Sequence, residues 1–132
     1  MIVKICILFL IIFLFGVVLV KLIEDVGNKA AEDNKIQNDI GVLGEELDIY
    51  KGKYGQYPKS LEVLVTAGQF KQMPNDQGQP YNYAVTQNGS SAKISQKLHS
   101  TSDYWCWKPD LPRINSTYGR TKKVQSEAEC QP

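Results

Sequence analysis

Residues 5–20 form an apolar run of 16 residues in which the Cys6 thiol is the only polar group, and this run constrains the fold most. It lies between Lys4 and Lys21, and residues 1–23 carry no other charge. A helix over residues 1–23 is long enough to span the hydrocarbon core of a bilayer, and the side chains of Lys4 and Lys21 are long enough to reach a membrane surface. We therefore expect residues 1–23 to form a transmembrane anchor.

A cleaved signal peptide also has a basic start and an apolar core, but it needs small residues just beyond that core. The sequence there is Val-Leu-Val-Lys-Leu, at residues 18–22, and the first alanine pair lies downstream at residues 30–31. We therefore expect the anchor to be retained, with the rest of the chain on one side of the membrane.

The 109 residues beyond the anchor are enough for one small domain. Residues 1–50 contain four Lys and eight Asp or Glu, a net charge of −4, whereas residues 51–132 contain eleven Lys or Arg and six acids, a net charge of +5. This excess is far below that of a dedicated nucleic-acid module, and solvated surface lysines explain it most simply.

Apolar residues recur at intervals of four and three between residues 36 and 50, which places them on one face of a helix. This head-packing stripe consists of Ile36, Ile40, Leu43, Leu47 and Tyr50. It covers about two heptads, too few for a coiled coil, so we expect it to pack on a sheet. Residues 24–54 are therefore predicted to continue the N-terminal helix, and residues 55–132 to form a globular head.

Turn residues divide the head into short elements. We expect a helix at 59–65 with Ser60 as its cap, turns at 74–80 and 88–89, and strands at 81–85, 92–95 and 104–107. Residues 109–132 are predicted to be loop.

Cys106 and Cys130 lie in the polar C-terminal region, where a disulfide would stabilise the head by about 3.5 kcal/mol in an oxidising compartment. Two free thiols are the alternative. We interpret Cys6 as an apolar residue of the anchor.

Two blocks of sequence resemble type IV pilins and the pseudopilins of type II secretion. The first is the apolar helix with its amphipathic continuation, followed by Leu-Asp-Ile-Tyr at 47–50 and Tyr-Gly-Gln-Tyr-Pro at 54–58. The second, at residues 73–83, is similar to the turn through which major pseudopilins enter their first strand. The Cys106 and Cys130 pair is similar to the C-terminal disulfide loop of many pilins.

The resemblance implies an α+β, pilin-like fold: a long N-terminal helix, with a transmembrane half and an amphipathic half, packed on a small antiparallel sheet with a C-terminal disulfide loop. It also implies that the anchor helices form the core of a filament. Gly16 is the one residue of the run that lets helices approach closely. The expected assembly and membrane contacts are Ile5, Leu8, Ile12, Gly16 and Val20.

Three features of the family have no counterpart in this sequence. Pilins carry a short basic leader and a glutamate a few residues into the apolar run, whereas no acid precedes Glu24 here. The calcium-binding aspartates of major pseudopilins are also missing. We therefore expect a minor subunit that enters a filament at its tip or as an initiator, or a pilin-like component that stays in the membrane.

An enzyme is not indicated. His99 is the only histidine, and the triad residue types at 99–103 are explained better by a polar turn, because sequence adjacency is not triad geometry. One histidine and three cysteines give no zinc-type spacing, so we expect neither a metal nor another cofactor.

A basic C-terminal set, interleaved with Trp105 and Trp107, is a candidate DNA contact. It consists of Lys108, Arg113, Arg120, Lys122 and Lys123. A solvated, disulfide-tied loop that contacts neighbouring subunits is the simpler interpretation, since Asp110, Glu127 and Glu129 dilute the charge.

These observations favour a structural subunit of a type IV pilus, or fimbrium, or of a related secretion or DNA-uptake filament. It would be a single-pass membrane protein with an extracytoplasmic head, in the periplasm or on a bacterial surface filament. The expected partners are other pilin subunits, the inner-membrane assembly machinery and membrane lipid. The alternatives are a DNA-binding minor pilin and a non-assembling single-pass adaptor of an extracytoplasmic complex.

Overall fold

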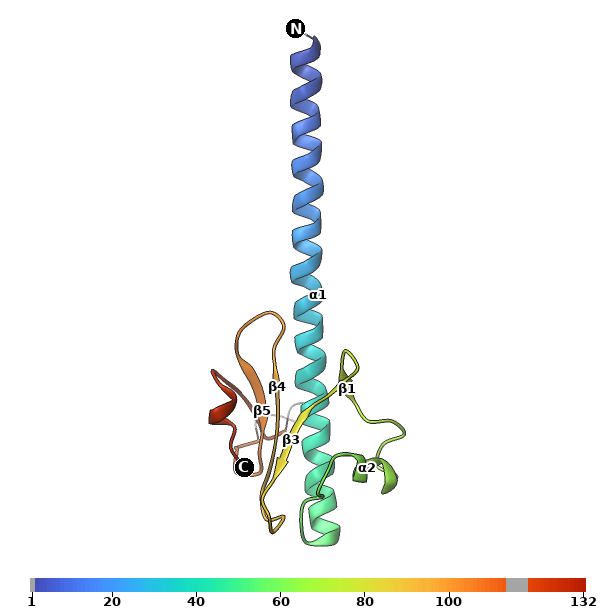
Figure 1. Ribbon diagram of the computed structural model, residues 1–132, viewed down its shortest axis with the longest axis vertical. Coiled ribbons are helices and arrows are strands. Elements are labelled where there is room, and N and C mark those ends of the chain that lie inside the picture. The colour runs from blue at the N-terminus through green and yellow to red at the C-terminus, as the bar shows by residue number, and fades with distance from the viewer. Residues whose placement is uncertain (1, 114–118) are drawn as a thin grey trace.

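The computed structural model describes residues 2–113 and 119–132, with side chains described from residue 10 onward. Helix α1 (Ile2–Tyr54) is one continuous rod, and the head is folded against its C-terminal part (Figure 1). This long helix and the small antiparallel sheets confirm the predicted α+β class.

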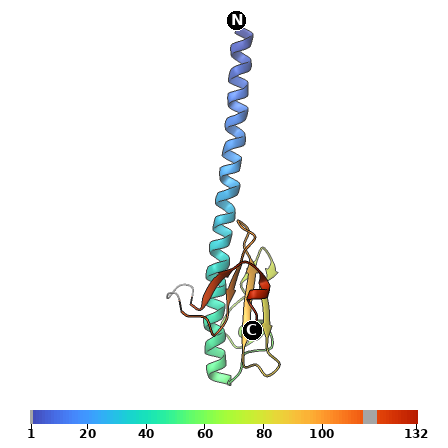
Figure 2. The same ribbon diagram turned by 90° about the vertical axis from the view of Figure 1, so that its left-hand side faces the viewer.

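Short elements make up the head. They are α2 (Glu62–Thr66), β1 (Asn75–Asp76), β2 (Gln79–Pro80), β3 (Asn82–Val85), β4 (Ala92–Lys97), β5 (Tyr104–Trp107), β6 (Thr121–Val124) and the 3-10 helix η1 (Glu127–Glu129). Strands β1 and β2 pair as a hairpin, and the other four form an antiparallel sheet in the order β3-β4-β5-β6. Helix α1 runs along one side of this sheet (Figure 2).

The core lies between α1 and the sheet. The residues of the stripe at positions 36, 40, 43 and 47 are at most 1% exposed, and Tyr50 packs at the edge of the same cluster. Trp107 faces them from β5 and is 1% exposed. Its ring lies so close to the helix that a Cβ at Gly44 would come within 2.1 Å of the indole Nε1. Glycine at this position is therefore what lets the sheet approach the helix.

A second, smaller cluster lies on the other face of the sheet. Cys106 alternates with Trp107 along β5 and packs there with Val124 and Cys130. Cys106 and Cys130 form a disulfide with a Cα–Cα distance of 5.9 Å, which confirms the predicted pairing.

Two expectations for the head were wrong. Residues 109–132 contain β6, whose Thr121 and Val124 are buried around two more exposed lysines, as well as η1. Helix α2 is shorter than expected and has no side-chain cap, because Leu61, whose side chain cannot accept a hydrogen bond, occupies the N-cap position instead of Ser60.

The sequence predicts a membrane span at residues 1–23. Over the part of the chain that the structure describes, no helix has the length and hydropathy of a membrane span. The backbone of the predicted run is helical from Ile2, and its side chains are described from Leu10 onward.

Candidate functional site

Most of the exposed large apolar side chains among the described residues belong to the part of α1 that extends beyond the head. Thirteen large apolar side chains between residues 10 and 26 are 42–72% exposed. They are Leu10, Ile11, Ile12, Phe13, Leu14, Phe15, Val17, Val18, Leu19, Val20, Leu22, Ile23 and Val26. Because most are consecutive, they cover every side of the helix. A helix that is hydrophobic all round is normally buried in protein or in lipid.

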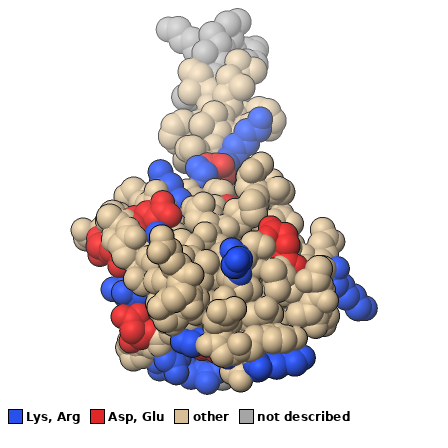
Figure 3. Space-filling view, turned by 60° about the horizontal axis from the view of Figure 1, so that its bottom comes forward, with Lys and Arg blue, Asp and Glu red and all other residues tan. Residues whose placement is uncertain are grey.

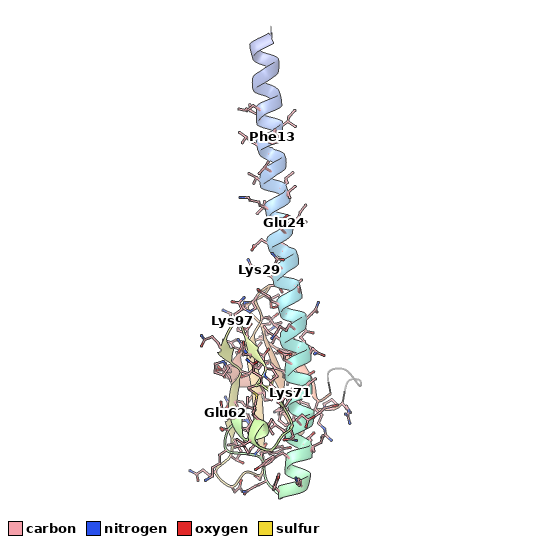
Figure 4. The ribbon with its side chains drawn as sticks, turned by 90° about the vertical axis from the view of Figure 1, so that its right-hand side faces the viewer. Phe13, Glu24, Lys29, Glu62, Lys71 and Lys97 are labelled. Carbon is pink, nitrogen blue, oxygen red and sulfur yellow. A yellow bond between two sulfur atoms is a disulfide. The ribbon has the colours of Figure 1, made fainter. Side chains whose placement is uncertain are left out.

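One side of this segment is hollowed around Gly16. The groove has a volume of about 500 Å³ and is lined by Phe13, Gly16, Val17, Val20, Lys21 and Glu24. Figure 4 shows Phe13 and Glu24 on the projecting part of α1. An added Cβ at Gly16 would meet nothing within 4 Å, so the space is open to a neighbouring molecule. The groove therefore combines an apolar floor with a charged end.

The predicted assembly residues are distributed as follows. Gly16 and Val20 line the groove, and Ile12 lies beyond it with an exposed side chain. Ile5 and Leu8 lie outside the residues whose side chains are described.

The predicted DNA-contacting set is not a free basic surface. Four of its five cations form ion pairs: Lys108 with Asp110 (3.4 Å), Arg113 with Glu45, Arg120 with Asp48 (3.8 Å) and Lys123 with Asp103 (2.7 Å). Lys122 is the one member without an ion pair to the described residues. On the face shown in Figure 3, Lys and Arg side chains are likewise interspersed with Asp and Glu. The two arginines thus tie the C-terminal segment to α1.

A polar junction that the sequence did not predict joins three elements at the stem end of the head. Asp33 of α1 is 5% exposed and accepts hydrogen bonds from the backbone N–H groups of His99 and Ser100. Asp76 of β1 accepts a bond from Gln96 Nε2 at 2.7 Å and lies 3.0 Å from His99 Nε2. The turn between β4 and β5 is therefore fastened to both α1 and the β1–β2 hairpin.

The carboxylates of this junction raise the pKa of His99. The hydrogen bond to Asp76 is the main cause that raises the pKa of His99, and the charges of Asp76, Glu32 and Asp33 add to it against partial burial. Asp33 lies three residues before Ile36 and seven before Ile40, so it continues the buried face of α1. That spacing was the signal by which the sequence could have identified it.

A polar cleft of about 610 Å³ adjoins the junction between α1 and β1. Among its lining residues, Asp39 pairs with Lys35 at 2.7 Å and accepts the Tyr81 hydroxyl at 2.7 Å. Burial and this hydrogen bond raise the pKa of Tyr81. No set of three or more His, Cys, Asp or Glu groups in the described residues is arranged to hold a metal ion. The charged groups of the cleft thus serve mainly to bind neighbouring elements together.

Comparison of the chain with protein-family models, with curated proteins and with solved structures gave no match. The candidate site is therefore defined by the molecule's own geometry. It consists of an apolar helix with an open groove, attached to a head whose polar groups are largely paired internally.

Proposed function

We propose that this chain is a pilin-like structural subunit that assembles, through α1, into a type IV filament or a related secretion or DNA-uptake machine. The observation that carries this proposal is the apolar part of α1, which extends beyond the head with thirteen large side chains exposed. Burying one such side chain stabilises a protein by about 1.5–3 kcal/mol, so this segment strongly favours an apolar environment.

Two environments satisfy that requirement in the proposed function. Lipid covers the segment while the subunit is a single-pass membrane protein, and apolar helices of other subunits cover it after assembly. The transfer from one to the other is a task for inner-membrane assembly machinery. A helix that only tethers the head needs hydrophobicity, whereas a helix that assembles also needs a shaped face, and the groove at Gly16 is such a face.

The disulfide supports an extracytoplasmic head, because such bonds form and persist in oxidising compartments. The resemblance of residues 47–58 and 73–83 to pilin-like sequences supports the same assignment. In this proposal the protein acts by assembly and performs no catalysis. The DNA-binding alternative is less favoured because the ion pairs of the basic C-terminal set already neutralise most of its charge.

Replacing Gly16 with leucine tests the proposal in the cells that produce the protein. Gly16→Leu keeps the segment apolar, so membrane insertion should be unchanged on alkaline extraction. Recovery in sheared filaments or membrane complexes should fall by about tenfold, as for a loss of about 1.4 kcal/mol in association. Val18→Leu is the control, since it adds bulk on the opposite side of the same helix.

The result that contradicts the proposal is equally direct. If Gly16→Leu is inserted, stable and recovered in filaments or complexes at the level of the unchanged protein, the groove is not an assembly face. Complete absence of the unchanged protein from such fractions would favour the non-assembling adaptor. Salt-sensitive binding of duplex DNA by the full chain in detergent would favour the DNA-binding subunit.

A further inference from the structure

Strand β3 forms one edge of the four-stranded sheet, as Figure 2 shows, and among the described residues only β4 pairs with it. In an antiparallel ladder, alternate residues of an edge strand direct their backbone N–H and C=O groups away from the sheet. Half of the four residues of β3 therefore present donors and acceptors outward. Over the described part of the chain, no backbone group outside β4 is bonded to residues 82–85. These outward groups are available to a further strand.

The two edges of this sheet differ in their protection against further pairing. Strand β6, at the other edge, has Lys122 and Lys123 among its four residues. Lysines on an edge strand hinder the approach of another chain, and native proteins use them for this purpose. Residues 77–92, which contain β3 and the segments that flank it, have no charged side chain. The edge at β3 is therefore unprotected, as expected of an edge that receives a strand.

A pocket of about 240 Å³ lies beside β3, on the side of the sheet that faces α1. Its apolar and aromatic lining comes from Leu61, Met73, Pro80, Tyr81 and Tyr83, with Lys59, Ser60 and Glu62 completing it. The Tyr83 hydroxyl donates to the Pro58 carbonyl at 2.7 Å, which fixes this ring in the wall. Side chains of a strand alternate between the two faces of a sheet, so a strand paired with β3 would direct alternate side chains toward this pocket.

Two antiparallel arrangements would place a second copy of the chain at this edge, and neither fits. This step rests on the proposed function, in which every copy is anchored in the same membrane. Strand β3 runs along α1, so antiparallel pairing of two β3 strands would direct the two α1 helices in opposite directions (Figure 1). Pairing of β3 with β6 of another copy avoids this reversal. Adjacent strands are rotated by about 20–25°, however, so four steps turn the second α1 by roughly 80–100°, out of the membrane-spanning direction.

Parallel pairing of two β3 strands does not fit either. A two-fold axis along the strands would set each outward N–H opposite the same N–H of the other copy, which leaves the donors unpaired. The edge therefore suits a segment of a different protein. That segment must be extended, to match the backbone groups of β3. It must also be uncharged, because residues 77–92 offer no counter-charge.

We propose that β3 receives an extended, uncharged segment of another protein as a fifth strand, antiparallel to β3, with one apolar side chain in the pocket. Backbone hydrogen bonds supply affinity in contacts of this kind, and the pocket selects the side chain. The edge belongs to the head, so α1 can remain in its membrane or assembly while the partner is bound. The chain then joins two contacts, one through α1 and one through β3.

A synthetic peptide tests the strand pairing. The probe is Thr-Val-Thr-Leu-Thr-Val-Thr, capped at both ends and labelled with a fluorescent dye. The full chain in detergent should bind it saturably in fluorescence anisotropy, relative to detergent alone. N-methylation of alternate peptide amides gives two matched controls. One set should weaken binding by at least about tenfold and the other should not, because only alternate amides of the peptide face β3.

Three further changes locate the contact. Replacing the central leucine of the peptide with alanine should weaken binding by about tenfold, because the pocket loses its side chain. In the chain, Asn82→Lys adds a charge at an exposed position of β3 and should weaken binding by a similar factor. Gln87→Lys is the control, since it adds the same charge at the exposed turn that follows β3. Equal melting temperatures verify that both variants are folded.

Amide hydrogen exchange identifies the edge that is used. Bound peptide should slow exchange in residues 82–85 and leave residues 121–124 unchanged. Protection of β6 or of the apolar part of α1 instead would overturn the inference. So would equal binding of both N-methylated peptides, because the contact would then not be a strand pair.

The outcome for this inference is separate from that for the proposed function. Absence of peptide binding, where Gly16→Leu still lowers recovery in filaments or complexes, would overturn the role of β3 and leave the proposed function standing. Peptide binding with the expected N-methylation pattern supports the role of β3 even if Gly16→Leu leaves recovery unchanged.

Discussion

Residues 10–26 and residues 36–47 of α1 are both rich in apolar side chains, but only the second part buries them within the chain. Between residues 36 and 47, the apolar side chains of the stripe repeat at helical spacing, and Ile36, Ile40, Leu43 and Leu47 are at most 1% exposed against the sheet. Between residues 10 and 26, they occur on every side and none meets the head, so they stay 42–72% exposed. Apolar residues at helical spacing thus identify the part of α1 that packs on the sheet. Apolar residues on every side of the helix identify the part that needs lipid or another protein to cover it.

The largest difference between the two parts of α1 is expected for a pair of leucine-to-alanine substitutions. Leu47→Ala removes a side chain with 0% exposure and should lower the free energy of unfolding by about 2–5 kcal/mol. Leu19→Ala should leave it unchanged within about 0.5 kcal/mol, because Leu19 does not contact the head. Denaturation of the full chain in detergent, followed by near-ultraviolet circular dichroism, measures both. Equal effects would show that the two parts unfold as one unit.

Alanine substitutions at Gly44 and Gly27 should change stability in opposite directions. Gly44→Ala would place a Cβ within 2.6 Å of three Trp107 ring atoms and should destabilise the head by about 1–3 kcal/mol. Gly27→Ala meets nothing within 4 Å and should favour the helix by up to about 1 kcal/mol. Thermal melting of the full chain, followed by the fluorescence of Trp105 and Trp107 together, compares them. A neutral Gly44→Ala variant would mean that the sheet can move away from α1 at little cost.

The smallest expected effect is a pH dependence confined to the head. The raised pKa of His99 means that the fold favours its protonated form. That contribution to stability is complete below the ordinary pKa of 6.5 and is lost as the pH rises through the raised value. Glu32 and Asp33 of α1 and Asp76 of β1 are the charged groups that favour it.

Melting temperatures measured from about pH 5.5 to about pH 8.5 should therefore fall more in the unchanged protein than in His99→Gln. Ser102→Asn, at an exposed position of the same turn, provides the control. Parallel curves for the protein with and without His99 would show that this side chain does not stabilise the junction through its charge.

Local patterns in the sequence predicted the regular parts of the fold. The stripe from Ile36 to Leu47, the hairpin turn at Asn88 and the strand that contains Trp107 all follow from spacing or turn chemistry, and the structure contains each of them. These features depend on neighbours within a few residues. The disulfide was also predictable, because only two cysteines lie in the head.

What the sequence did not predict depends on partners far along the chain. Strand β6 has two lysines in its four residues and becomes a strand because it pairs with β5. Arg113 and Arg120 suggested a basic surface, yet their ion pairs are with Glu45 and Asp48 of α1. The junction at Asp33 likewise joins residues more than 60 positions apart. Helical spacing can indicate that Asp33 is buried, but no local pattern identifies His99 and Ser100 as its partners.

The disulfide between Cys106 and Cys130 also has a mechanical consequence. If the molecule is pulled between its N-terminal helix and its C-terminal end, every residue outside a covalent loop can contribute to extension once the head yields. The 24 residue steps between Cys106 and Cys130 cannot extend while the disulfide is intact, so the fully extended chain is shorter by about 80 Å. Strand β6 lies wholly within the loop. Under load, the last part of the head therefore stays a compact, covalently closed end, and the extensible chain lies between α1 and Cys106.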